Sequence, residues 1–281
     1  MRKVIIPVDF SENAMNAVTY ACELFRHETC KLFILHAYEE EVFAEESILN
    51  KETLEERKKA VRQHAEQKLQ DLKTQLLKSY DTTKHEIALV SAFGLLIDEV
   101  NDLAEREDAD LIITSTRGIT NDRKLTFGSN TLQIIKYVQC PVLSIPEHYR
   151  FSTPRHILFP SNFLLPYQQR ELDLIGGIAR SFSSHVHLLY ASRSAAMSLR
   201  QEANKNAILD QLQEVKVKLH HEELEKTAAI EKMAESLKAD LLVLVNSRHS
   251  YLENILYTST IDKIGLHPKM PFLALQNFHR F

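Results

Sequence analysis

The chain has little glycine, little cysteine and no tryptophan: its 281 residues include six glycines and three cysteines. The cysteines Cys22, Cys30 and Cys140 form no CxxC pair, and their odd number argues against a disulfide framework. We therefore expect reduced thiols in the cytoplasm that pack as small core side chains. No apolar run approaches the roughly 20 residues needed to span a bilayer, and Pro7 and Asp9 interrupt the N-terminus too early for a signal peptide.

Signatures of well-known catalytic and metal sites are also missing. The sequence contains no GxxxxGKS/T, GxGxxG, HExxH or GxSxG. Its 13 histidines include His185 and His187 on one face of a predicted strand, but no spacing matches a zinc site with three or four ligands. The net charge of −4 provides no field that attracts nucleic acid. We predict no catalytic residue, no metal site, no nucleic-acid partner and no membrane association.

What the sequence does contain is a duplication. Residues 2–10 resemble residues 155–163, and "ADLIITSTRG" at 109–118 aligns without a gap to "ADLLVLVNSR" at 239–248. The apolar and charged fractions, 44% and 26%, are those of a globular protein whose length suits two domains. The repeat predicts a first domain over 1–146 and a shorter second domain over 155–281.

Within each half, β-branched apolar runs alternate with helical patterns. The runs predict strands over 3–8, 31–38, 85–90, 109–114 and 140–146, and over 156–161, 185–191, 215–220, 240–245 and 271–275. Between them the periodicity predicts helices over 11–27, 52–79, 94–107 and 130–138, and over 166–182, 199–214, 222–238 and 259–266. Alternating elements of this kind favour an α/β fold with a parallel sheet and right-handed crossovers. We interpret 52–79 as a helix that packs one apolar stripe on the sheet and exposes a charged face.

Two of the six glycines, Gly118 and Gly128, follow the strand over 109–114. Glycine permits a positive φ or a close approach of the backbone to a ligand. The second glycine runs into Ser129, Asn130 and Thr131, whose amides begin a helix and can bind an anion. Ligands of open parallel sheets bind at the carboxyl ends of the strands, where Asp9 also lies. The residues alone leave a second interpretation open, in which the glycines only make turns and Ser129 only caps a helix.

This pattern resembles the universal stress protein family, in which a first-strand aspartate is combined with G-x2-G-x9-G-S/T after the fourth strand. Here the motif is carried by Asp9, Gly118, Gly128 and Ser129, with Ser115 in place of the first glycine. The resemblance implies two tandem Rossmann-like domains of the adenine nucleotide alpha hydrolase type. Each would have a five-stranded parallel sheet with helices on both faces.

The ATP-binding members of that family imply roles for individual residues, with ATP or AMP as ligand, with or without Mg²⁺. The residues implied to line the adenosine pocket are Pro7, Asp9 and Ala37. Those implied to lie against the nucleoside are Thr114 and Ser115, and those implied to hold the phosphates are Gly118, Gly128, Ser129, Asn130 and Thr131.

The second half departs from the motif at nearly every position. Its counterparts of Asp9, Ser115, Gly118 and Gly128 are Asn162, Val245, Arg248 and Thr258. A bulky arginine and a β-branched threonine fit poorly where the backbone needs a positive φ or must approach phosphate. We therefore predict one nucleotide for each chain, bound in the first domain.

The sequence thus predicts a cytoplasmic adenine-nucleotide-binding protein that regulates an unidentified protein partner. Two alternatives remain, a slow ATPase or nucleotidyl-transferring enzyme and a scaffold without ligand. We also expect the last strands of the two halves, 140–146 and 271–275, to pair as in a dimer made within one chain, with a homodimer as a further state.

Overall fold

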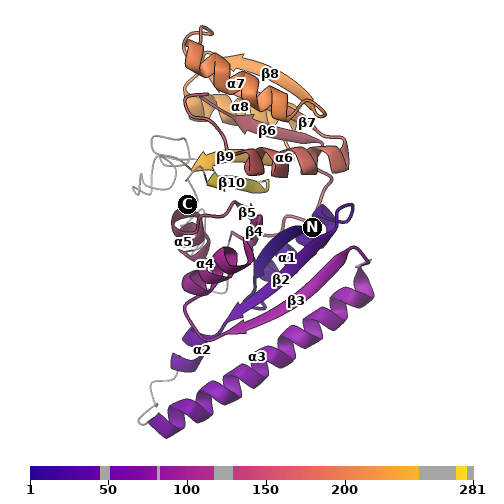
Figure 1. Cartoon of the computed structure of the whole chain (residues 1–281), viewed down its shortest axis with the longest axis vertical. Coiled ribbons are helices and arrows are strands. Elements are labelled where there is room, and N and C mark those ends of the chain that lie inside the picture. The colour runs from indigo at the N-terminus through magenta and orange to yellow at the C-terminus, as the bar shows by residue number, and fades with distance from the viewer. Residues whose placement is uncertain (45–50, 81–82, 117–128, 247–269, 277–281) are drawn as a thin grey trace. The chain divides into compact units, whose positions relative to one another are not determined.

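Four apolar strands form the parallel sheet of the first unit (Figure 1). They are β1 (Arg2–Pro7), β2 (Cys30–Ala37), β3 (His85–Ala92) and β4 (Leu111–Ser115), in the spatial order β3-β2-β1-β4. Their apolar side chains are largely buried because helices cover both faces of the sheet. The chain leaves β1 toward β2 on one side and places β4 on the other, so the carboxyl end of β1 is a topological switch point.

The computed structural model describes residues 1–44, 51–80, 83–116, 129–246 and 270–276. Two compact units make up the chain, one of residues 1–121 with 127–140 and the other of residues 122–126 with 141–281. None of the helices in the described part is long and apolar enough to cross a membrane.

The helices of the first unit follow the predicted order. They are α1 (Glu12–Leu24), α2 (Glu39–Phe43), α3 (Lys51–Ser79), α4 (Leu96–Glu107) and α5 (Ser129–Tyr137). Right-handed crossovers place α1 and α3 on one face, and α4, which returns the chain from β3 to β4 and contacts α5, on the other. Ser11 caps α1 as expected, because its hydroxyl accepts the N–H of Ala14 at 3.1 Å. The short helix α2 was not predicted.

Helix α3 is the predicted amphipathic helix, and it runs alongside β3 (Figure 1). Its buried stripe comprises Val61, Ala65, Leu69, Leu72 and Leu76. Most of its charged residues are exposed, and the ammonium of Lys73 donates to the carbonyl of Ile87 at 2.9 Å. Because β3 is the outer strand of this unit, that bond covers part of its edge.

The second unit repeats the alternation. Its strands are β5 (Val142–Ile145), β6 (His156–Pro160), β7 (His185–Ala191), β8 (Lys216–Glu222), β9 (Leu241–Asn246) and β10 (Phe272–Gln276), in the order β5-β10-β9-β6-β7-β8. Its described helices are α6 (Gln169–Phe182), α7 (Leu199–Gln211) and α8 (Lys226–Leu237). The helix predicted over 259–266 lies outside the described residues.

Strand β5 runs antiparallel to β10, with Leu143 opposite Leu273, while the other paired strands of this unit are parallel. The two last strands of the sequence repeats therefore pair, as their apolar sequences predicted. This pairing groups β5 with the second unit, although it precedes residue 146 in the chain. The domain boundaries at 146 and 155, and the dimer-like packing of two whole halves, stay predictions.

The duplication is visible in the backbone as well as in the sequence. Phe10 and Phe163 follow equivalent strands and both have a left-handed backbone, with φ of 59° and 55°. Asp108 and Lys238 end equivalent helices, both with φ of 49°. No positive-φ residue in the described ranges is a glycine, although other residues pay roughly 1–2 kcal/mol for this conformation.

Two aspartates at equivalent positions of the repeats make the same kind of hydrogen bond. The Asp110 carboxylate accepts the N–H of Lys3 at the start of β1, at 2.7 Å, and the Asp240 carboxylate accepts the N–H of His156 at the start of β6, at 2.9 Å. Each bond fastens the loop before the fourth strand of a repeat to the beginning of its first strand.

The three cysteines are buried and unpaired with one another. Burial raises the pKa of Cys22 and of Cys30 to about 12, so both thiols stay protonated at neutral pH. Their prediction as core side chains is confirmed.

Candidate nucleotide-binding site

The loop after β1 is shaped by Asp9. Pro7 ends the strand as a buried residue, and the N–H of Val8 still pairs with the carbonyl of Leu35 at 2.8 Å. The Oδ1 atom of Asp9 then accepts the N–H of Ser11 at 3.0 Å, which closes a tight turn around the left-handed Phe10. The half-buried carboxylate of Asp9 is thereby held at the carboxyl end of the central strand.

The end of β2 is fastened to this loop by His36. Its Nδ1 lies 2.8 Å from the carbonyl oxygen of Val8, and its Nε2 lies 3.0 Å from a carboxylate oxygen of Glu41 in α2. The ring also contacts Phe10, with centroids 4.7 Å apart. His36 is therefore a positioning residue for the loop that carries Asp9, and it places the adjoining Ala37, which is half-buried.

Sequence reasoning missed His36. The available signal was a polar residue inside the apolar run over 31–38, next to the predicted ligand residue Ala37. A buried histidine in such a run needs partners for both ring nitrogens, which indicates a contact with a neighbouring loop.

The end of β4 and the start of α5 form the third part of the site. Thr114 and Ser115 are buried at the end of the strand. The hydroxyl of Thr131, in the first turn of α5, donates to the carbonyl of Ser115 at 2.7 Å. That hydroxyl is engaged within the protein, so a phosphate would meet the backbone N–H groups of this turn. Asn130 is exposed.

The structure thus brings some of the predicted residues to one edge of the sheet. Pro7, Asp9, Ala37, Thr114 and Ser115 come from the carboxyl ends of β1, β2 and β4, which are neighbouring strands. The backbone of Ser129 begins α5. Gly118 and Gly128 lie outside the described residues. Among the residues that the structure does describe, no cluster of histidine, cysteine, aspartate or glutamate could hold a metal ion.

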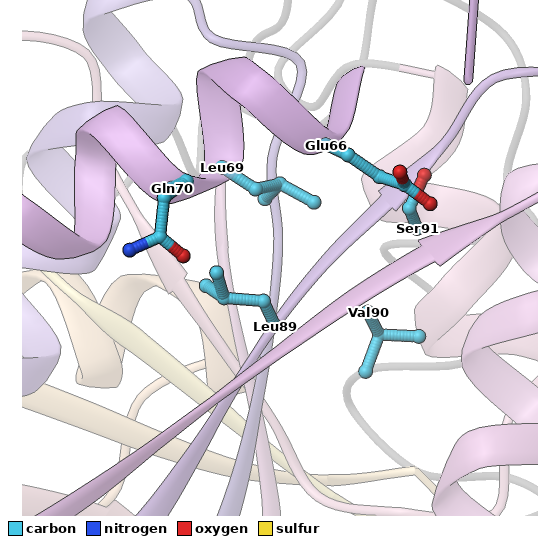
Figure 2. A pocket seen from close by; sticks show the side chains of 6 residues that line it. All are labelled: Glu66, Leu69, Gln70, Leu89, Val90 and Ser91. Carbon is cyan, nitrogen blue, oxygen red and sulfur yellow. The ribbon is translucent and has the colours of Figure 1, made fainter. Parts of the chain in front are cut away.

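A separate pocket of about 420 Å³ lies between α3 and β3 (Figure 2). Its lining residues are Glu66, Leu69, Gln70, Leu89, Val90 and Ser91. None of the predicted site residues is among them, and Glu66 contributes a carboxylate to the lining. A carboxylate at this place disfavours phosphate groups, so we do not assign the nucleotide to this pocket.

In the second unit, side chains of α7 hold the equivalent loop closed. The amide of Gln201, on α7, donates to the carbonyl of Asn162 at 2.8 Å, and that of Asn204 donates to the carbonyl of Phe163 at 2.8 Å. Tyr190 stands where the first unit has His36, and its ring contacts Phe163. These contacts hold helix α7 against the loop after β6.

The ends of β9 and β10 carry a buried cluster of hydrogen-bonded polar residues. The amide of Asn246 donates to Gln276 at 2.8 Å, and the N–H of Gln276 donates to the carboxyl group of Glu171 at 2.6 Å. All three residues are buried. Asn246 is the counterpart of Thr116, and its amide is engaged by Gln276. Arg248 and Thr258 lie outside the described residues.

These features define a class of protein. Parallel strands joined by helices, with polar residues at a switch point, make both units Rossmann-like α/β structures. The Universal stress protein family profile matches residues 1–146 and again residues 166–276. The chain belongs to the universal stress protein family, with two such domains in tandem.

Individual relatives agree with this assignment. Universal stress protein MJ0577 of Methanocaldococcus jannaschii is 26% identical over 156 residues, which cover 51% of this chain and 94% of the relative. Universal stress protein MJ0531 of the same organism is 26% identical over 155 residues, which cover 52% of this chain and 82% of the relative. The crystal structure of a universal stress protein from Archaeoglobus fulgidus has the same fold, with a TM-score of 0.71, 14% identity and 98% of each chain covered.

Proposed function

We propose that the first unit binds an adenine nucleotide, ATP or AMP, and that occupancy of this site regulates a protein partner in a stress response. The observation that carries the proposal is the convergence of Asp9, Ala37 and Ser115 at the carboxyl ends of three neighbouring strands. These residues match the positions of the family's nucleotide motif in the sequence.

Each part of the site suits one part of the ligand. The carboxylate of Asp9 accepts hydrogen bonds from ribose hydroxyls or from the adenine amino group. The N–H groups in the first turn of α5 and the positive end of the helix dipole attract phosphate. Gly118 and Gly128 complete the phosphate loop, and Mg²⁺ accompanies the nucleotide only if a triphosphate is the ligand.

We propose that the second unit binds no nucleotide. The side-chain amides of Gln201 and Asn204 donate hydrogen bonds to backbone carbonyls of the loop after β6. Asn162 stands at the position of Asp9 and carries no charge. Opening that loop for a ligand would leave these amides and carbonyls without partners, at a cost of about 1–3 kcal/mol for each buried group.

Isothermal titration of the full chain with ATP, ADP and AMP, with and without Mg²⁺, tests the proposal. We expect one site for each chain. A ligand bound only by the folded state adds about 2.7 kcal/mol of stability at 100 times its dissociation constant, and Asp9→Ala and Gly128→Val should each lose that gain. Asn162→Ala is the matched control in the second unit, and this variant should keep the full stabilisation by nucleotide.

The alternatives make different predictions for the same samples. Two equivalent sites, or a site that is unaffected by Asp9→Ala, would contradict the assignment to the first unit. Absence of any heat or thermal shift would favour the scaffold without ligand, and steady release of phosphate would favour a slow ATPase. Native mass spectrometry of the freshly purified protein shows which nucleotide is retained.

A further inference from the structure

Four histidines gather on one face of the second unit's sheet. They are His156 on β6, His185 and His187 on β7, and His220 on β8. Nδ1 of His156 lies 3.1 Å from Nε2 of His187, and Nδ1 of His187 lies 2.9 Å from Nε2 of His220. These three rings form a hydrogen-bonded histidine chain across three neighbouring strands, and His185 stacks on His156 with centroids 5.8 Å apart.

The histidine chain joins the edge strand of the unit to its interior. Strand β8 ends the spatial order, and most of its side chains are exposed or half-buried. His187, in contrast, is only 1% exposed. Helix α8 covers this face, because its Lys232 pairs with Glu222, which lies two residues beyond His220 on the same side of β8.

The hydrogen bonds constrain the protonation of the rings. A neutral imidazole has one donor nitrogen and one acceptor nitrogen, so a chain of neutral rings is fully bonded. In two adjacent protonated rings all four nitrogens are donors, and the bond between the rings is lost. Positive charge also meets further positive charge here, since Lys218 lies opposite His187 and Lys216 lies opposite His185 in the strand register.

We propose that the histidine chain makes the second unit an acid sensor, in which β8 is held on β7 while the rings are neutral and is released in mildly acidic solution. The groups that face the chain are His185, Lys216 and Lys218 from the sheet, and Glu222, whose carboxylate is already paired with Lys232 of α8. Among the described residues, therefore, no uncommitted carboxylate is in place to neutralise a proton on His187.

The direction of the pH dependence follows from the same surroundings. Burial, and then the neighbouring His220, His156 and Lys218, lower the pKa of His187 from 6.5 to about 4. Burial and the lysines lower the pKa of His185 and of His220 as well. The unfolded chain therefore takes up protons near pH 6.5 and the folded chain only at lower pH. The stabilisation is complete above pH 6.5 and is lost as pH falls toward 4.

Hydrogen exchange of the full chain, corrected for the intrinsic pH dependence of exchange, tests the release of β8. We expect amides of residues 216–222 to lose at least about tenfold protection between pH 7.5 and 5, while amides of β1 and β2 change little. His220→Gln keeps a side chain that can donate and accept but does not titrate. This variant should lose part of the pH dependence in β8, because His187 stays buried beside His156.

The matched control is His64→Gln, which removes an exposed histidine from α3 and should leave the pH dependence of β8 as in the wild type. NMR titration of the histidine Cε1 protons gives an independent readout that does not depend on any variant. A midpoint for His187 at or above 6.5, or equal pH dependence of β8 in His220→Gln and the wild type, would overturn the proposal.

Discussion

The hydroxyl of Thr131 donates to the backbone carbonyl of Ser115 at 2.7 Å, and both residues are buried. This bond fixes the first turn of α5 against the last residue of β4. The helix end that is proposed to meet phosphate is thereby held at a defined place relative to the strand end that is proposed to meet the nucleoside.

Thr131→Val keeps the shape of the side chain but removes the donor. Because the carbonyl of Ser115 would lose a buried partner, we expect the free energy of unfolding to fall by about 1–2 kcal/mol and nucleotide affinity to weaken. Chemical denaturation and calorimetric titration measure the two effects. Asn130→Ala, which changes the exposed neighbouring residue, should alter stability by less than about 0.5 kcal/mol; equal losses in both variants would contradict this account.

Asn204→Ala tests the closed loop of the second unit. The carbonyl of Phe163 would lose its partner on α7, so we expect a loss of about 1 kcal/mol in unfolding free energy. We expect no gain of a second nucleotide site, because Asn162 and the other replaced motif residues remain. Asn206→Ala, on an exposed position of the same helix, is the control. A second binding event in Asn204→Ala would show that only the amide keeps nucleotide out.

Glycine at the left-handed helix ends should stabilise the protein. Lys238→Gly relieves a strained backbone with φ of 49°, and the gain exceeds the entropy cost of glycine, so we expect about 0.5–1 kcal/mol more stability. Ser183→Gly, at the left-handed end of α6, should stabilise the protein by a similar amount. Glu235→Gly, inside α8, should instead destabilise by about 1 kcal/mol. Thermal denaturation distinguishes these outcomes, and destabilisation by Lys238→Gly would refute the strain argument.

The buried cysteines should resist thiol reagents in the native protein. Since burial raises the pKa of Cys22 and Cys30 to about 12, almost no thiolate is present at pH 8. We expect no rapid labelling by a disulfide reagent at pH 8 and labelling of all three cysteines in denaturant. Glu105→Cys, on an exposed helical position, provides a rapidly labelled control. Fast reaction of the wild type would show that the core opens readily.

The order of strands and helices was predictable because apolar runs and helical periodicity are local properties of the sequence. The boundaries of the elements were less predictable where a side-chain hydrogen bond decides at which residue a helix begins. Helix α8 begins at Lys226 rather than near 222, since β8 continues to Glu222 and the carboxylate of Glu225 caps the helix by accepting the N–H of Thr227. Helix α2 has only five residues and a run of glutamates, which carries no periodic signal.

At the candidate site, the sequence located the strand ends but not the contacts that shape them. His36 meets the carbonyl of Val8, a residue 28 positions away, and Thr131 meets Ser115 across a loop. Such bonds depend on the relative placement of distant backbone segments, which no local pattern encodes. The closure of the second loop by Gln201 and Asn204 was likewise invisible, because exposed amides on a helix are common.

The antiparallel pairing of β5 with β10 also sets an order of events during synthesis. Leu143 leaves the ribosome long before its partner Leu273, and at roughly 5–20 residues per second the interval is on the order of 10 s. Throughout that interval β5 presents an apolar edge with unpaired backbone groups. A nascent chain on a neighbouring ribosome presents the same edge, so two incomplete chains can pair through their β5 strands before either one has made β10.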